Sequence, residues 1–220
     1  MPKIKRIIDL SLAIFPGMSR PLVVRDVEVK HVATVDKDGV DVSELFMSAH
    51  TGTHFDAPKH FVGPGIGVDQ VNLETVIGEA VVFDLTHLPP KHEITAQDLD
   101  PFSSRVMANG IVLLRTGSDK WVNTPQYLTD YPYIGGAAAR WLVEKKVRTV
   151  GVDFLAVDAL SKEPLSLDAH HTLLGAGVGI VECLANLGAI GAERPLFIAA
   201  PLKIEGGDAS PVRALAIEFK

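Results

Sequence analysis

The stretch that decides which fold and chemistry to expect runs HTGTHFDAPKH, from His50 to His60. It places three imidazoles and one carboxylate within eleven residues, and five of the eight histidines lie either here or in the pair at positions 170 and 171. Neutral imidazole and carboxylate are ligands that suit zinc and manganese. The segment therefore predicts a divalent-metal site.

The backbone of this segment is predicted to be extended, not helical. His50 and His54 have the spacing of one helix face, but Gly52 and Pro58 are poor helix residues. In an extended segment alternate side chains point to the same side, so His54 and Asp56 share a face. Gly52 allows the bend that brings His50 beside them. We expect His50, His54 and Asp56 to bind a metal and leave open positions, as in catalytic sites.

A second set of candidate ligands lies far downstream. Asp168 is suited to cap a helix, and Gly175 would end that helix within two turns. An apolar run from Val178 then stops at Glu182, whose carboxylate would need a cation or a donor if buried. By themselves, His170 and Glu182 fit a salt bridge or a helix cap as well as metal ligation.

The other histidines and the single cysteine are assigned from their neighbours in the sequence. His60 follows a proline and is expected to transfer protons, with a hydrogen bond to a metal ligand as the alternative. We expect three isolated histidines to be structural or exposed, namely His31, His87 and His92. Cys183 lies in an apolar run and is expected to be a buried, inert thiol.

Short apolar runs typical of buried strands occur along most of the chain. They cover Lys3 to Leu10, Ala80 to Leu85, Ile111 to Arg115, Thr149 to Asp153, Leu196 to Ala200 and Ala214 to Phe219. A hairpin is predicted from Asp26 to Ala49, with its turn from Asp36 to Gly39. The clearest amphipathic helix spans Gly136 to Lys145. We expect a strand-rich α/β chain that forms one domain over residues 1–220, because no long Pro/Gly/Ser-rich linker interrupts it.

Composition and charge argue against several classes of partner. The 220 residues are 47% hydrophobic and 22% charged, which is ordinary for a compact globular domain. The formal net charge is −6 and the basic residues are scattered, so no nucleic-acid partner is expected. One cysteine cannot form an intrachain disulfide, and the N-terminal MPKIKRIIDL lacks a long apolar stretch. We therefore expect a cytoplasmic protein without a membrane partner.

The motif His-x-Gly-Thr-His-x-Asp-x-Pro-x-His, matched from His50 to His60, resembles that of the cyclase-like, metal-dependent hydrolases. This family includes the bacterial kynurenine formamidases, or arylformamidases. Supporting stretches are Asp9-Leu10-Ser11, Gly151-Val152-Asp153, His170 to Glu182 and Ala200-Pro201-Leu202. The resemblance implies a swivelling β/β/α domain with a strand-rich mixed sheet, assembled as a homodimer or higher homo-oligomer.

The resemblance also implies how metals are held. His50, His54 and Asp56 would bind a first metal. Asp56 would bridge to a second metal held by His170 and Glu182. His170 is preferred over its neighbour because the family's second histidine precedes its glutamate by twelve residues, as His170 precedes Glu182. The expected cofactor is two Zn²⁺ ions per chain, with Mn²⁺ as the alternative.

The activity implied by the resemblance is hydrolysis of a small amide by a metal-activated water, with His60 as the proton donor or acceptor. The substrate would be an arylformamide such as N-formylkynurenine, a reaction of tryptophan catabolism. Formamidases of the family carry an aromatic residue in a Trp-Pro-Gly-Asp-like stretch, where this chain has Met18-Ser19-Arg20-Pro21-Leu22. The alternatives are hydrolysis of another cyclic amide such as isatin, a cyclase or dehydratase reaction on the same metals, and a non-catalytic metal-binding protein.

Overall fold

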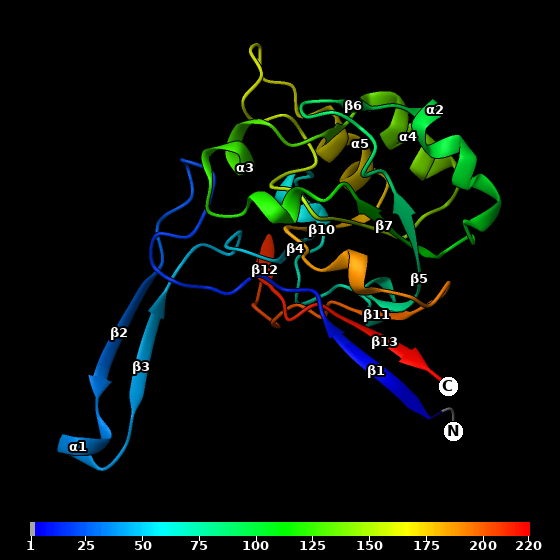
Figure 1. Cartoon of the computed structure of the whole chain (residues 1–220). Coiled ribbons are helices and arrows are strands. Elements are labelled where there is room, and N and C mark those ends of the chain that lie inside the picture. Colours follow the sequence, from blue (N-terminus) through cyan, green and yellow to red (C-terminus); the bar gives the residue numbers. More distant parts are fainter. Residues whose placement is uncertain (1–2) are drawn as a thin grey trace.

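A mixed sheet of nine strands, flanked by short helices, forms the body of the molecule (Figure 1). The computed structural model describes residues 3–220. The strands are β1 (Ile4–Asp9), β2 (Glu28–Ala33), β3 (Val42–Phe46), β4 (His54–Asp56), β5 (Ile77–Asp84), β6 (Glu93–Ile94), β7 (Ile111–Arg115), β8 (Tyr133–Ile134), β9 (Thr149–Val152), β10 (Gly179–Glu182), β11 (Leu196–Ile198), β12 (Ala209–Pro211) and β13 (Leu215–Phe219). The α-helices are α1 (Val35–Asp38), α2 (Ala96–Leu99), α3 (Pro125–Thr129), α4 (Gly136–Glu144) and α5 (Asp168–Gly175). The 3₁₀ turns are η1 (Pro58–His60), η2 (Leu73–Thr75), η3 (Asp100–Arg105), η4 (Ser118–Trp121) and η5 (Leu187–Ala189).

The strand order of the main sheet is β1-β13-β11-β5-β7-β9-β10-β4-β12. Its centre, from β5 to β10, is parallel, and the strands on either side pair antiparallel. Parallel strands are typically covered on both faces, which explains why the central strands are continuous apolar runs. Strand β4, which carries the candidate ligands His54 and Asp56, lies near one end of the sheet, between β10 and β12.

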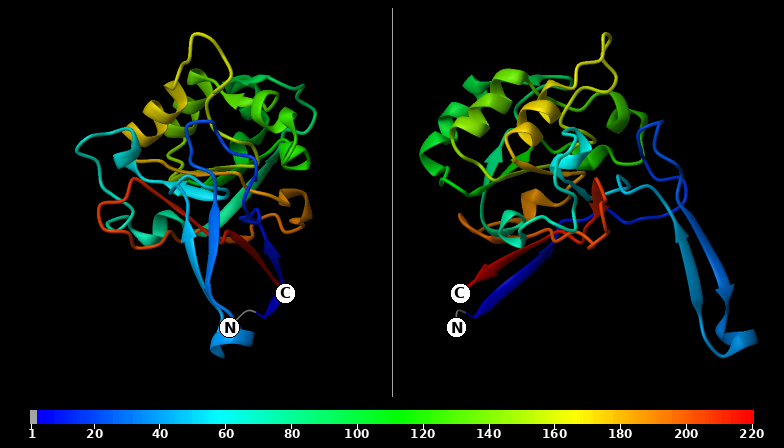
Figure 2. Two further views of the ribbon diagram at one scale, coloured as in Figure 1. Left: turned by 90° about the vertical axis from the view of Figure 1, so that its left-hand side faces the viewer. Right: turned by 180° about the vertical axis from the view of Figure 1, so that it is seen from behind.

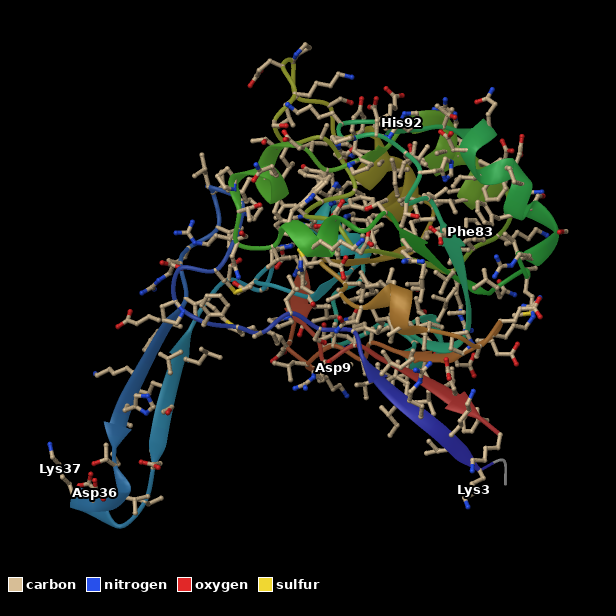
Figure 3. The ribbon with its side chains drawn as sticks, in the orientation of Figure 1. Lys3, Asp9, Asp36, Lys37, Phe83 and His92 are labelled. Atoms are coloured by element: carbon tan, nitrogen blue, oxygen red, sulfur yellow. The ribbon has the colours of Figure 1, made fainter. Side chains whose placement is uncertain are left out.

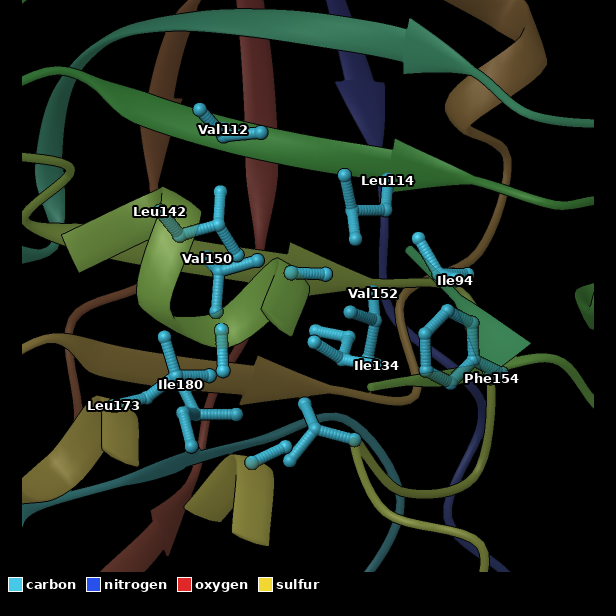
Figure 4. Close-up of a cluster of buried hydrophobic side chains, with 14 of the residues drawn as sticks. Ile94, Val112, Leu114, Ile134, Leu142, Val150, Val152, Phe154, Leu173 and Ile180 are labelled. Carbon is cyan, nitrogen blue, oxygen red and sulfur yellow. The ribbon is translucent and has the colours of Figure 1, made fainter. Parts of the chain in front are cut away.

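Two hydrophobic cores pack against opposite faces of the sheet, because successive strand side chains alternate between faces. On one face Val112 and Leu114 of β7 lie in the core that α4 and α5 cover with Leu142 and Leu173 (Figure 4). On the other face Leu113, from the same strand, joins a second core made by the remaining strands. Strand β4 is part of this sheet and packs into the second core through Phe55.

The hairpin of β2 and β3 stands apart from this body as its own two-stranded sheet (Figures 1 and 2). The single helical turn α1 forms its tip, and Gly39 ends that turn in the left-handed conformation, with φ +73°. Figure 3 shows Asp36 and Lys37 at this tip, far from Phe83 in the body. The hairpin expected from the sequence is present, although its turn is helical.

The expected fold class, a swivelling β/β/α domain with a strand-rich mixed sheet, is confirmed. The expected long apolar strands and the helix beginning at Gly136 are present within a few residues of their predicted bounds. One local expectation is wrong: Asp168 is the first residue of α5 and Leu167 occupies the N-cap without a side-chain hydrogen bond. Asp158, in the loop that leads from β9 into α5, caps this helix instead. Within residues 3–220, no helix combines the length and apolarity needed to cross a membrane.

Candidate metal centre

Strand β4 places two of the expected ligands on the same face of the sheet. Its three residues alternate, so His54 and Asp56 face the site while Phe55 enters the second core. In the antiparallel pairing of β4 with β10, His54 lies opposite Glu182. Directly opposed residues share a face, so the register brings Glu182 to the site as well.

The bend before β4 sets the orientation of His54. Gly52 adopts the left-handed conformation, with φ +61°, which favours glycine. Its carbonyl oxygen lies 2.8 Å from His54 Nδ1, and because a carbonyl only accepts, Nδ1 carries the proton in this contact. His54 Nε2 therefore presents its lone pair to the site, 3.4 Å from Asp56 Oδ1 and 3.6 Å from Glu182 Oε2.

His170 enters from the first turn of α5 and is held by Asp158. The Asp158 carboxylate accepts hydrogen bonds from the backbone N–H groups of Ala169 and His170, at 2.9 and 3.1 Å. The same carboxylate lies 2.6 Å from His170 Nδ1. The opposite nitrogen, Nε2, faces the site at 3.3 Å from Glu182 Oε1. The neighbouring His171 is exposed, so the structure brings only the first of the two histidines into the cluster.

His50 and His60 lie on the more open side of the cluster, next to Asp208. His50 Nδ1 is 3.0 Å from Asp56 Oδ1, and its Nε2 is 2.9 Å from Asp208 Oδ2. His60 Nδ1 lies 3.4 Å from the same Asp208 oxygen, and the two imidazole centroids are 4.2 Å apart. The ligand atoms of His50, His60 and Asp208 lie within 4.8 Å of one another.

Asp56 is at the centre of the arrangement. Imidazole nitrogens of His50, His54 and His170 face its carboxylate at 3.0, 3.4 and 3.8 Å. The side chain is fully buried, yet within residues 3–220 no donor meets hydrogen-bond geometry at either oxygen. A buried carboxylate without donors is costly, and a cation between the oxygens and these nitrogens would remove that cost. The donor set of imidazoles and carboxylates therefore fits a divalent metal.

Two overlapping groups share Asp56. The ligand atoms of His50, His54 and Asp56 lie within 4.8 Å of one another, and so do those of Asp56, His60 and His170. The second group differs from the sequence-based set, which paired His170 with Glu182. The structure leaves Glu182 within 3.3 Å of His170, but its Oε1 also accepts a hydrogen bond from the Val157 N–H at 2.7 Å.

Excess negative charge determines how the cluster titrates. Burial disfavours protonation of His170, but its hydrogen bond to Asp158 and the nearby carboxylates of Asp56 and Glu182 outweigh burial and raise its pKa to about 12. Burial also opposes protonation of His50, whereas Asp56 and Asp208 raise the pKa of His50 to about 9. The pKa of Asp56 itself is held well below its usual value, against burial, by the facing imidazoles. Protons thus occupy histidines that a metal would deprotonate.

His60 behaves differently from the other histidines of the cluster. Burial lowers the pKa of His60 below its ordinary value of 6.5, and the neighbouring imidazoles lower it further. It is therefore neutral at neutral pH and able to accept a proton. In the metal-free protein, His60 is therefore neutral, whereas His50 and His170 are protonated and positively charged.

A cavity of about 180 Å³ opens above the cluster. Histidines and Glu182 form its floor, and its walls are mainly apolar, with contributions from Pro21, Val23, Val24, Phe61, Leu155, Leu160 and Leu167. Apolar walls around a few convergent polar groups are typical of sites for small organic molecules. The segment Met18–Leu22, where the aromatic residue of formamidases is absent, contributes Ser19, Arg20 and Pro21 to the wall.

Sequence reasoning missed the two carboxylates that hold the histidines, Asp158 and Asp208. Asp158 comes six residues after β9, and Asp208 comes directly before β12. No spacing relation to a histidine marks either residue. The remaining isolated histidines lie elsewhere: His31 contacts Ser43 in the hairpin, and His92 contacts Asp98.

Comparison with known proteins identifies relatives along most of the chain. The family model Cyclase, described as "Putative cyclase", matches residues 8–159. A kynurenine formamidase from Bacillus cereus is 34% identical over 180 residues, covering 82% of this chain and 81% of that protein. A kynurenine formamidase from Geobacillus thermodenitrificans is 34% identical and covers 81% of both chains.

Solved structures share the fold over nearly the whole chain. Isatin hydrolase A from Labrenzia aggregata, bound to benzyl benzoate, superposes with a TM-score of 0.89 at 30% identity. The match covers 98% of this chain and 94% of that one. A protein described as a predicted metal-dependent hydrolase, from Bacillus stearothermophilus, superposes with a TM-score of 0.80 at 30% identity, covering 96% of this chain and 98% of that one.

Proposed function

This chain belongs to the Cyclase family, and from that premise we propose that it hydrolyses an arylformamide, with N-formylkynurenine as the leading substrate. The protein is a metal-dependent amide hydrolase, as its similarity to kynurenine formamidases and isatin hydrolases shows. The comparisons do not favour a cyclase reaction or a non-catalytic metal-binding role.

The observation that carries the metal proposal is the orientation of three histidines around one buried carboxylate. In each of His50, His54 and His170, one ring nitrogen contacts a carboxylate or carbonyl oxygen outside the centre, while the other faces Asp56. Metal-binding histidines characteristically have such a second partner, which sets the tautomer and ring orientation. This pattern supports metal binding more strongly than the presence of the residues alone.

We assign the first metal to His50, His54 and Asp56. A second would be held by Asp56, His170 and Glu182, so that Asp56 bridges the two. Zinc suits the imidazole-rich first set, and manganese suits the carboxylates, so two Zn²⁺ ions with Mn²⁺ as the alternative remains our proposal. Such a cation, when bound, polarises an amide carbonyl and makes a water molecule more acidic.

His60 is the residue that we assign to proton transfer. It lines the cavity, and burial keeps it neutral, so its imidazole can take a proton from the attacking water. The same imidazole can then return the proton to the leaving amine, which is a poor leaving group until it is protonated. Asp208, 3.4 Å from His60 Nδ1, supports the orientation of the ring.

The walls of the cavity favour a substrate with an aryl group. Phe61, Leu155 and Leu160 offer apolar surface next to the histidines, and excluding water there strengthens polar interactions at the reacting amide. These side chains take over part of the role of the family's aromatic residue, which is absent from Met18–Leu22. We therefore expect turnover of N-formylkynurenine with a raised KM, since burying a ring contributes a few kcal/mol.

The decisive experiment is steady-state kinetics on metal-loaded protein, with N-formylkynurenine compared with isatin. We expect both amides to be hydrolysed, with higher kcat/KM for the formamide. The matched variant replaces His50, His54 and Asp56 by alanine, and it should lose both metal and activity. The variant His87→Ala changes a histidine outside the cluster and should retain both. Wild-type protein that hydrolyses neither amide after metal loading contradicts the proposal.

We also propose that the active form is a homodimer whose contact involves the β2–β3 hairpin. The hairpin leaves apolar side chains exposed, including Val32, Val42 and Leu45, and an isolated two-stranded sheet is only marginally stable in water. Burial against a second copy would cover these residues, in agreement with the oligomers that the resemblance implies. Light scattering should show a dimer for the wild type and a monomer for Leu45→Glu; a monomeric wild type contradicts the proposal.

A further inference from the structure

Arg20 lines the cavity above the candidate metal centre. Of the described residues that line this cavity, Arg20 is the only arginine, and no lysine is among them. Its guanidinium keeps its positive charge whether or not a metal is bound. Its side chain is 26% exposed, compared with 64% for the nearby Arg25. Partial burial of a guanidinium beside apolar walls costs free energy unless its N–H groups find acceptors.

Asp26 anchors Arg20 without using up its hydrogen-bonding capacity. Asp26 Oδ1 lies 3.3 Å from Arg20 Nε and also accepts hydrogen bonds from the N–H groups of Gly17 and Val27, at 3.0 and 2.9 Å. The two terminal nitrogens of Arg20 have no hydrogen-bond partner among residues 3–220. The edge formed by these nitrogens therefore remains free, while the Nε side is fixed.

The position of Arg20 relative to the metal centre defines what could bind there. Arg20 also lines a second, adjoining apolar cavity, and both cavities share Pro21, Val23, Leu155 and Leu160. Arg20 thus belongs to the wall that the two cavities share, whereas the histidines line only the first cavity. A ligand whose amide reaches the histidines would place its opposite, more distant end beside Arg20.

We propose that Arg20 recognises a carboxylate at the end of the substrate remote from the scissile amide. This inference rests on the proposed function and narrows it to amides that are anionic at that end. The free Nη1–Nη2 edge matches the two oxygens of a carboxylate, which guanidinium binds in a bidentate manner. Arg20 is accordingly a specificity-determining residue, at a position where formamidases of the family have an aromatic stretch.

The test compares N-formylkynurenine with its carboxamide analogue, in which the carboxylate is replaced by a neutral amide. We expect the wild type to prefer the acid by about 10- to 100-fold in kcat/KM, as for a hydrogen-bonded charge pair. Arg20→Gln should abolish this preference, because it lowers kcat/KM for the acid by more than it lowers kcat/KM for the carboxamide. Arg25→Gln is the matched control, because Arg25 lies in the same segment outside the cavity, and it should retain the preference.

Two results overturn the inference: a wild type without preference for the acid, and an Arg20→Gln variant that slows both compounds equally. If the wild type hydrolyses neither compound, the proposed function fails, and binding of kynurenine measured by calorimetry then decides the role of Arg20. We expect binding to be at least about 10-fold weaker to Arg20→Gln than to the wild type or Arg25→Gln. Equal binding to all three, or no binding to the wild type, overturns the inference independently of catalysis.

Discussion

Replacing Asp158 by alanine tests whether the histidines of the centre are held by residues outside it. The buried carboxylate accepts hydrogen bonds from two backbone N–H groups at the start of α5, at 2.9 and 3.1 Å, and lies 2.6 Å from His170 Nδ1. The substitution therefore removes a helix cap and the group that orients His170. It leaves every proposed ligand in the sequence.

The magnitude follows from these contacts. Loss of a helix cap costs about 1 kcal/mol, and loss of a hydrogen bond to a charged group costs about 2 kcal/mol. We expect the free energy of unfolding of the metal-free protein to fall by about 3 kcal/mol. Because the ring of His170 would lose its fixed orientation, metal affinity should fall by about 10- to 100-fold.

The assay is denaturant unfolding in the presence of a chelator, together with a metal titration of folded protein. Asp158→Asn separates the two effects. An amide oxygen can still accept a hydrogen bond from the helix N-terminus. The amide N–H₂, however, donates to His170 Nδ1, so the ring proton moves to Nε2, the nitrogen that faces the proposed metal, and Nε2 can no longer bind it. The amide oxygen can still accept the Ala169 N–H, but the N–H₂ group cannot accept the His170 N–H, so this variant should recover part of the stability without recovering affinity. Asp98→Ala, which removes the N3 side chain of the capping box that Thr95 and Asp98 form at the start of α2, should cost stability and leave affinity unchanged. Wild-type metal affinity in Asp158→Ala would refute the reasoning.

Three further expectations concern other residues of the site. His60→Ala should lower kcat by about 10²- to 10⁴-fold at near-normal metal content; loss of metal as well would make His60 a ligand. In metal-free protein, burial opposes protonation of His50, but Asp56 and Asp208 raise its folded pKa from 6.5 to about 9. Its contribution to stability is therefore complete below pH 6.5 and is lost as the pH rises through 9, which unfolding at several pH values with and without metal should show. Gly52→Ala should lower the unfolding free energy by about 1 to 2 kcal/mol, because φ is +61° there and the new Cβ would lie 3.2 Å from Met18 Cε; an unchanged denaturation midpoint would contradict this.

The sequence predicts those elements whose burial produces a recognisable pattern of apolar residues within the element itself. Strands β7 and β9 lie in the parallel centre of the sheet and are buried on both faces, so they are continuous apolar runs and were predicted almost to the residue. Strand β12 was not predicted, since its three residues include Ser210 and Pro211 and it exists by pairing with β4. Its position depends on a strand order that does not follow the sequence.

The same distinction applies to the candidate site. His54 and Asp56 could be placed together because the alternation of an extended strand acts within three residues. Asp208 could not be placed, because its position beside His50 depends on β12 lying along β4, with Ala209 opposite Asp56. Site residues that share one strand, such as His54 and Asp56, can therefore be recognised from their spacing in the sequence. A residue that reaches the site through the pairing of distant strands, such as Asp208, cannot.

The supporting residues determine more than affinity, because they decide which imidazole nitrogen faces the centre. His54 contacts the Gly52 carbonyl through Nδ1 and presents Nε2, and His170 does the same through Asp158. His50 is reversed: Asp208 takes Nε2, so Nδ1 faces Asp56. A motif specifies three imidazoles but not this pattern of tautomers, which depends on partners up to 158 positions away along the chain. Since a metal binds only a nitrogen without a proton, Asp158 and Asp208 help to determine which nitrogens of the proposed centre can bind it.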